Sequence, residues 1–165
     1  MSDNVRTRVA VLADIHGNLP ALEAVLDDAR RIGVDAFAVA GDFTGGPWSQ
    51  PTVERVQALT DLVIAGNHEG YYTAYDRGEA PAGWYESDQW AAMRWSYRRL
   101  TRAGLDAIAA LPHQLVVTFD DASAGPAPDP VRVVHGTPES ATRHLYPDRS
   151  PEAPAAFRRA GLLRD

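Results

Sequence analysis

The segment TRVAVLADIHGNLPAL, residues 7–22, decides the fold of the N-terminal part of the chain. Its first seven residues are a short apolar, β-branched run, which predicts a strand over 7–13. Asn18 then signals the start of a helix, Pro20 suits the first helical turn, and apolar residues recur at helical spacing up to the stop signal Gly33. The segment therefore predicts a strand, a tight loop and an amphipathic helix in succession.

The same order of elements recurs downstream. We predict a strand over 36–40, a helix at about 52–60 and a strand over 61–65. This βαβαβ alternation predicts a parallel sheet with helices packed on it. The remaining expectations are an excursion over 70–86 whose residues 71–85 are a candidate lid, two helices within 87–110, a hairpin with strands near 114–119 and 131–135, and a tail helix over 150–161.

Composition limits the possible functions. The 165 residues suit a single domain over 1–165, and their net charge of -6 predicts no stable nucleic-acid complex. Because the chain has no Cys, any metal must be held by oxygen and imidazole nitrogen. The N-terminus lacks a signal pattern, and no apolar run approaches the ~20 residues of a membrane span. We therefore expect a soluble, cytoplasmic protein without a membrane partner.

Polar residues follow the ends of the predicted strands, in four separate segments. In an open parallel sheet ligands bind at the carboxyl ends of the strands, so we expect these segments to converge. Taken singly, loop capping explains each residue, but six of them at four strand ends indicate one shared site. The six are Asp14 and His16, Asp42, Asn67 and His68, and His135.

Carboxylate, amide and imidazole ligands suit divalent Mn, Fe, Co, Ni or Zn. A second Asp between two ions is a natural bridge, and two ions can clamp a phosphate and activate a water between them. This chemistry predicts phosphoester hydrolysis. His68 is placed to protonate the leaving alkoxide or to hold a phosphate oxygen, and Glu69 either orients His68 or is a solvated acid.

From about Arg8 to Pro138 the chain resembles the calcineurin-like metallophosphoesterases, especially the small bacterial phosphodiesterase-type members. The resemblance rests on Asp14-x-His16 with the following Gly-Asn-Leu-Pro-Ala-Leu, on Gly41-Asp42, on Gly66-Asn67-His68-Glu69, and on Val134-His135-Gly136-Thr137-Pro138. It implies an α/β fold in which a β-sandwich of mixed sheets is flanked by helices. It also implies two divalent ions, with manganese the first choice. Asp14 and His16 would bind the first ion, Asp42 would bridge, Asn67 and His135 would bind the second, and His68 would be the catalytic imidazole.

The sequence departs from the family in one respect. Family members continue into another strand and a G-H-x-H motif, whose two His complete the metal sites, and this chain has no such motif. We therefore expect a domain that is C-terminally incomplete, with part of its second sheet missing and an open edge that invites association with another copy. A shortened product, a domain-swapped or dimeric form, and a degenerate member that binds metal poorly all fit this pattern.

Two functions stay open. The first is hydrolysis of a small phosphomonoester or phosphodiester by a hydroxide that bridges two ions. The second is a degenerate or truncated relative with a partial metal site, acting as a non-catalytic binding or oligomerising protein. A dinucleotide-binding module fits poorly, because no G-x-G-x-x-G follows the first strand. Aromatic residues between 71 and 97 could stack a nucleobase or fill a helix core, and we expect Trp90 and Trp95 in that core.

Overall fold

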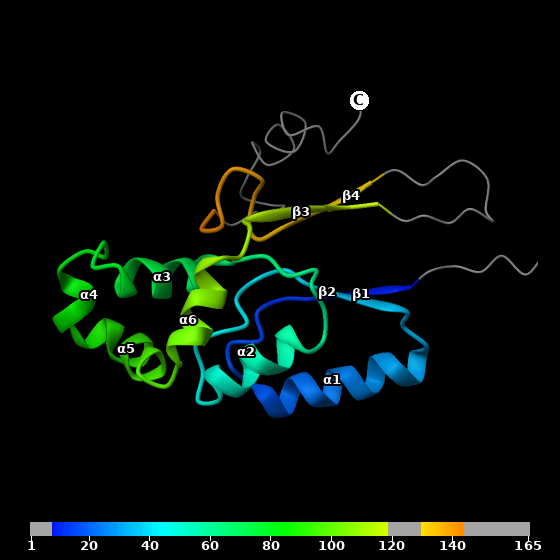
Figure 1. Ribbon diagram of the computed structural model, residues 1–165, viewed down its shortest axis with the longest axis horizontal. Coiled ribbons are helices and arrows are strands. Elements are labelled where there is room, and N and C mark those ends of the chain that lie inside the picture. The colour runs from blue at the N-terminus through cyan, green and yellow to red at the C-terminus, as the bar shows by residue number, and fades with distance from the viewer. Residues whose placement is uncertain (1–7, 119–129, 144–165) are drawn as a thin grey trace, which may run out of the picture.

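The computed structural model describes residues 8–118 and 130–143, so the predicted tail helix over 150–161 lies outside the described residues. Figure 1 shows the elements in chain order. They are β1 (Val9–Leu12), α1 (Leu19–Ile32), β2 (Ala36–Val39), α2 (Ser49–Gln57), α3 (Asn67–Asp76), α4 (Gly83–Glu86), the 3₁₀ turn η1 (Asp88–Trp90), α5 (Ala91–Tyr97), α6 (Arg102–Ala109), β3 (Gln114–Val117) and β4 (Val131–Val134). Within the described residues no helix is long and apolar enough to span a bilayer.

The N-terminal unit forms as the sequence predicts. Strands β1 and β2 pair in parallel. Helix α1 begins where the Asn18 side chain accepts a hydrogen bond from the Ala21 N–H at 3.1 Å, and it ends at Gly33 in the left-handed conformation (φ 77°). Both caps satisfy backbone groups that the helix itself leaves without partners.

The predicted strand over 61–65 is reduced to one parallel bridge, between Val39 and Val63. The segment leaves the sheet after this bridge, because the Ala65 N–H donates to the Pro112 carbonyl at 2.8 Å instead of to a strand partner. The expected third strand is therefore a short extended connection that still ends beside β2.

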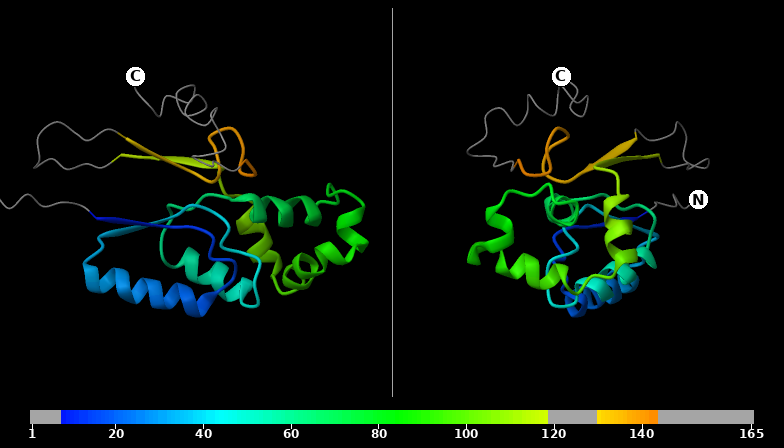
Figure 2. Two further views of the ribbon diagram at one scale, coloured as in Figure 1. Left: turned by 180° about the vertical axis from the view of Figure 1, so that it is seen from behind. Right: turned by 60° about the vertical axis from the view of Figure 1, so that its left-hand side comes forward.

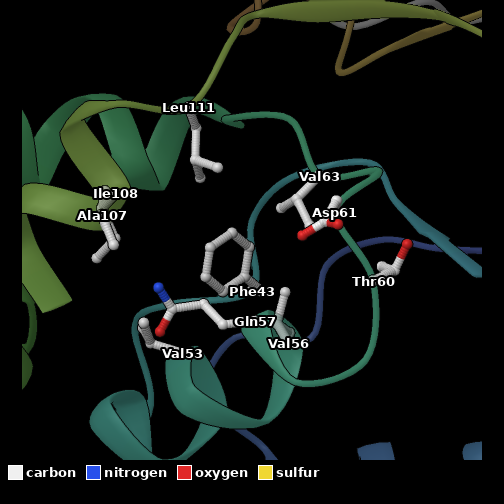
Figure 3. Close-up of a pocket in the computed structure, with 10 residues that line it drawn as sticks. All are labelled: Phe43, Val53, Val56, Gln57, Thr60, Asp61, Val63, Ala107, Ile108 and Leu111. Atoms are coloured by element: carbon white, nitrogen blue, oxygen red, sulfur yellow. The ribbon is translucent and has the colours of Figure 1, made fainter.

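The main core lies between the β1–β2 pair and helices α1, α2 and α6 (Figures 1 and 2). Leu26 and Val39 are fully buried there, and Phe43 is 2% exposed. Burial of such apolar surface is the main force that holds the helices on the strands. Figure 3 shows Phe43 between side chains of α2 and α6, where the core leaves a cavity of about 400 Å³ lined mainly by apolar residues.

Strands β3 and β4 form the predicted hairpin and pair antiparallel. Figures 1 and 2 show this hairpin across the β1–β2 pair from α1, and Val133 packs there against Ala40 and Ile64. Parallel and antiparallel pairs thus lie over one another with helices alongside. The predicted class of mixed sheets flanked by helices is confirmed.

Residues 71–85, the candidate lid, are not the irregular excursion expected, because they belong to a helical lobe made by α3, α4, η1 and α5 (Figure 1). Tyr72 anchors the lobe: it is fully buried, packs near Met93 and hydrogen-bonds to the Ser96 hydroxyl. Trp90 packs partly buried against this core. The expectation for Trp95 is wrong, since it is 44% exposed and one face is covered by the guanidinium of Arg99 at 3.4 Å.

Candidate functional site

The loops after β1 and β2 are joined backbone to backbone. The His16 N–H donates to the Asp42 carbonyl at 2.9 Å, and the Gly17 N–H donates to the Phe43 carbonyl at 2.8 Å. Asp14, His16 and Asp42 all adopt the left-handed conformation, with φ of 56°, 47° and 54°. This conformation costs a non-glycine residue about 1–3 kcal/mol, and such strain is concentrated at functional sites.

Asp42 is the centre of the site. It is only 3% exposed, and its Oδ1 accepts a hydrogen bond from the backbone N–H of His68 at 2.9 Å. Its Oδ2 lies 3.9 Å from Nε2 of His16, and its Oδ1 lies 3.6 Å from Nε2 of His135. One buried carboxylate therefore faces an imidazole on each side, and these imidazoles come from segments more than a hundred residues apart.

The ring of His135 is held in a defined orientation. Its Nδ1 lies 2.8 Å from the Ala40 carbonyl, which can only accept, so Nδ1 carries the proton. The Nε2 lone pair is left facing the site, 3.1 Å from Oδ1 of Asn67. Two lone pairs directed at the same space suit a cation, and a backbone carbonyl on the far nitrogen is a typical support for a metal-binding His.

The loops approach one another so closely that some positions accept no side chain. A Cβ at Gly66 would lie 2.1 Å from Oδ1 of Asp42, and a Cβ at Gly41 would lie 2.5 Å from the Gly66 nitrogen. Real Cβ atoms do not approach other atoms so closely. Glycine at both positions therefore allows α3 to begin directly against Asp42.

Glu69 has a different role from either one proposed for it. It is fully buried, so it is not a solvated acid, and its carboxylate accepts hydrogen bonds from the Asp42 loop and from Gly66, not from His68. Its Oε2 accepts from the N–H groups of Asp42 (2.7 Å) and Gly66 (2.8 Å). Its Oε1 accepts from the N–H (3.0 Å) and the hydroxyl (2.7 Å) of Thr44. Glu69 thus connects the Asp42 loop to the start of α3.

The sequence did contain a partial signal for this role. Glu69 is at position N3 of α3, three residues after the N-cap Gly66, which is the spacing of a capping box. That spacing predicts the bond to the Gly66 N–H. The bonds to Asp42 and Thr44 cross 27 and 25 residues and have no local pattern.

His68 is half-buried beside Asp42, and its ring lies edge-on to His16 with centroids 4.6 Å apart. Its buried Nδ1 has no hydrogen-bond partner among the described residues. Burial lowers the pKa of His68 below its usual value, with the neighbouring His16 and His135 acting in the same direction and Asp42 opposing them. The neutral imidazole is favoured, and its lone pair is available to a ligand.

All six residues predicted from the sequence line one cavity of about 530 Å³: Asp14, His16, Asp42, Asn67, His68 and His135. Within it, two groups have ligand atoms that all lie within 4.8 Å of one another, one made by His16, Asp42 and His68 and the other by Asp14, Asp42 and His135. The expected convergence is therefore present, with Asp42 common to both groups.

The donor set fits divalent ions. The carboxylate–imidazole separations of 3.6 Å and 3.9 Å around Asp42 are too long for hydrogen bonds. They are, however, of the size expected between atoms that share a cation, and imidazole with carboxylate suits Mn, Fe, Co, Ni or Zn. The site is buried on one side, at His135 (12% side-chain exposure), and open on the other, at Asp14 (62%).

The calcineurin-like phosphoesterase family model matches residues 7–155. The chain belongs to this family. Proteins of the family are generally metal-dependent hydrolases of phosphoesters, which agrees with the Asp and His cluster described above.

Solved structures are similar across most of the chain. A metallophosphoesterase from Sphaerobacter thermophilus superposes with a TM-score of 0.66 and 28% identity, over 86% of this chain and 52% of that one. A hypothetical protein from Pyrococcus horikoshii shares the fold at a TM-score of 0.71 and 22% identity, over 94% of this chain and 66% of that one. An uncharacterized protein of Methanocaldococcus jannaschii is 39% identical over 66 residues, which are 39% of this chain and 27% of that protein. The chain thus spans about half the length of the Sphaerobacter structure and about two thirds of the Pyrococcus structure, and its match covers about a quarter of the Methanocaldococcus protein.

Proposed function

We propose that this chain hydrolyses a small phosphomonoester or phosphodiester with the help of two divalent ions, manganese being the first choice. The observation that carries the proposal is the position of Asp42, whose two oxygens face His16 on one side and His135 on the other. Asp14 and His16 would hold one ion, Asn67 and His135 the other, and Asp42 would contact both. When bound, such ions neutralise phosphate charge and activate water for attack on phosphorus.

The residues of the chain have distinct tasks in this reaction. Water oxygen loses a proton and forms a bond to phosphorus, the ester P–O bond breaks, and the leaving oxygen takes up a proton. His68, beside Asp42 in the same cavity, holds a phosphate oxygen through its N–H or, once protonated, supplies the proton that the leaving oxygen takes. Glu69 and the glycines keep Asp42 and the start of α3 in register, which fixes the ligands before substrate binds.

The test is hydrolysis of bis(p-nitrophenyl) phosphate with Mn²⁺, together with calorimetric titration of Mn²⁺ into the chelator-treated protein. Asp42→Asn keeps the shape and removes the shared charge, so we expect turnover to fall by at least about a hundredfold and Mn²⁺ binding to weaken. Asp106→Asn on α6 is the matched control, since Asp106 is 65% exposed and pairs with Arg102.

Turnover that persists in chelator, or that Asp42→Asn leaves intact, contradicts the proposal. Binding of Mn²⁺ without any turnover would instead support the second function, a non-catalytic relative with a partial metal site. The open side of the site at Asp14 and His16, whose side chains are 62% and 43% exposed, is where such a partial site would be weakest.

A further inference from the structure

A row of aromatic rings leads away from the metal-ligand cluster. The His68 ring contacts His16 on one side, and on the other side it faces Tyr71 with centroids 5.5 Å apart. Tyr71 stands edge-on to Trp84 at 5.1 Å and to Trp90 at 5.5 Å. Trp84 and Trp90 stack on each other at 3.9 Å. We call Tyr71, Trp84 and Trp90 the aromatic row.

Tyr71 lies outside the core of the helical lobe, whereas Trp84 and Trp90 pack against that core and keep part of their surface exposed. Tyr71 comes three residues after His68, so both lie on one face of α3. Tyr72, the next residue, is fully buried and fills the lobe core, whereas Tyr71, Trp84 and Trp90 all remain partly exposed. Tyr71 lies on α3, Trp84 on α4 and Trp90 in η1. Figures 1 and 2 show α4 beyond the outer end of α3, so the row runs from the helix that carries His68 into the outer part of the lobe.

The row is also held rigidly. The guanidinium of Arg94 on α5 donates to the carbonyls of Trp84 at 2.9 Å and Ser87 at 2.8 Å, which fixes the turn between α4 and η1. In the same lobe, the rings of Tyr75 and Tyr85 stack at 4.7 Å. A rigid aromatic surface can stack a planar group without first losing much conformational freedom.

We propose that the aromatic row binds a nucleobase carried by the alcohol part of the phosphoester, so that the substrate is a nucleotide ester. The inference rests on the proposed function, because the cavity beside His68 has to hold the phosphate. The spacing favours a nucleoside over a simple aryl alcohol. An aryl ring bonded to the ester oxygen would lie at His68 itself, whereas a base is separated from the phosphate by a sugar, and Tyr71 and Trp84 lie one and two ring contacts beyond His68.

The experiment compares two phosphodiesters that differ only in the base: adenosine 5′-(methyl phosphate) and the methyl riboside 5′-(methyl phosphate). The readout is the ratio of their kcat/KM values with Mn²⁺. We expect a ratio of about ten or more in the wild type, as stacking of one base on an aromatic side chain supplies. Tyr71→Leu and Trp84→Leu should each lower the ratio toward one, while Tyr71→Phe, which keeps the ring, should retain it.

Trp95→Leu is the matched control, because Trp95 belongs to the same lobe and is 44% exposed, with its ring against Arg99. It should leave the ratio unchanged. A wild-type ratio near one, or a Tyr71→Leu variant that slows both substrates equally, overturns the inference. An equal loss on phenyl methyl phosphate also overturns it, since the row would then recognise any aryl ester.

A binding measurement separates this inference from the proposed function. Adenosine is titrated into the chelator-treated protein, and quenching of tryptophan fluorescence is followed in the wild type and in Tyr71→Leu. Quenching that the variant loses, without turnover of either diester, would mean that the proposed hydrolysis fails while the base site stands. Turnover of both diesters with no quenching would mean that the hydrolysis stands and the base site is absent. If Tyr71→Leu does not fold, the binding of adenosine to Trp84→Leu is measured by calorimetry, because this variant lacks one of the tryptophans that report quenching.

Discussion

Replacing Glu69 by Gln tests how the site is held in place. The substitution keeps the size of the side chain but removes its charge and turns one acceptor oxygen into an N–H₂ donor. In the wild type the carboxylate accepts four hydrogen bonds, from the N–H groups of Asp42, Gly66 and Thr44 and from the Thr44 hydroxyl. Three of these donors are backbone N–H groups, which can donate a hydrogen bond but cannot accept one.

The structure sets the size of the effect. If the amide nitrogen replaces Oε2, the N–H groups of Asp42 and Gly66 both lose their acceptor. If it replaces Oε1, the Thr44 hydroxyl can rotate to accept, and only the Thr44 N–H is left without a partner. The second arrangement destabilises the fold less, because it leaves one buried N–H group unpaired instead of two. It costs about 1–3 kcal/mol for one buried unpaired donor, plus the loss of charge assistance in the remaining bonds. We therefore expect Glu69→Gln to lower the free energy of unfolding by about 2–4 kcal/mol.

The assay is denaturant unfolding of the chelator-treated protein, with Mn²⁺ binding measured on the same samples. Glu54→Gln on the exposed face of α2 is the matched control, since Glu54 only accepts a hydrogen bond from Gln50 at 2.8 Å. A surface change of this kind should stay within about 0.5 kcal/mol. If Glu69→Gln also changes the free energy of unfolding by less than that, the four bonds do not hold the loop and the reasoning is refuted.

Two further predictions follow from the same region and its neighbourhood. Gly66→Ala would set a Cβ 2.1 Å from Oδ1 of Asp42, so we expect calorimetry to show at least about tenfold weaker Mn²⁺ binding. In the control Gly70→Ala, on the same helix, the new Cβ meets nothing within 4 Å, and the free energy of unfolding should rise by about 0.5–1 kcal/mol. Equal Mn²⁺ affinities of the two variants would contradict the steric argument. Hydrogen bonds from Arg102 lower the pKa of Asp76 below its ordinary 3.8, so this pair stabilises the fold above that pH and loses its effect as the pH falls through the lowered pKa. Asp76→Asn should therefore cost under about 1 kcal/mol at pH 7 in urea unfolding, and this cost should shrink as the pH falls through the lowered pKa of Asp76; a cost that does not change with pH would exclude the ion pair as its source.

The N-terminal unit could be predicted because its signals are local. The Asn18 cap, the Gly33 stop and the apolar spacing between them act within a few residues, and they set α1 without help from the rest of the chain. Convergence of Asp14 and Asp42 could also be predicted, since the parallel strands β1 and β2 bring their carboxyl ends together. His135 joins them from the separate antiparallel hairpin, where its ring meets the Ala40 carbonyl at the end of β2. The order of the elements also brings Asn67 and His68 to the site, although the predicted third strand before them is reduced to a single bridge.

The predictions for residues 71–85 and for Trp95 were wrong because packing between elements, and not a local signal, decides the structure there. Residues 71–85 have the Gly and Tyr content of a loop. Tyr72, however, hydrogen-bonds to Ser96 and is buried in the lobe core, and this tertiary burial stabilises the helix in spite of the local pattern. Trp95 has a ring that suits a core, but it lies outside on α5 and stacks under Arg99. The contact between Tyr72 and Ser96 spans 24 residues, which no local pattern reports. The exposure of Trp95 depends on which face of α5 packs on the lobe core, and Met93 occupies that face.

The site also explains why strain and buried charge are combined here. Asp42 and Glu69 are 3% and 0% exposed, they lie one hydrogen bond apart, and no Arg among residues 8–118 and 130–143 pairs with either of them. Burying carboxylates without a cationic partner is costly, and Asp42 adds a left-handed backbone to that cost. Backbone N–H groups offset the charge of Glu69, but Asp42 accepts only one such bond, from His68. The remaining oxygen of Asp42 faces the imidazole nitrogen of His16, which is neutral when it acts as a metal ligand. In the proposed function a divalent ion would supply that cationic charge, and we predict that its binding raises the free energy of unfolding.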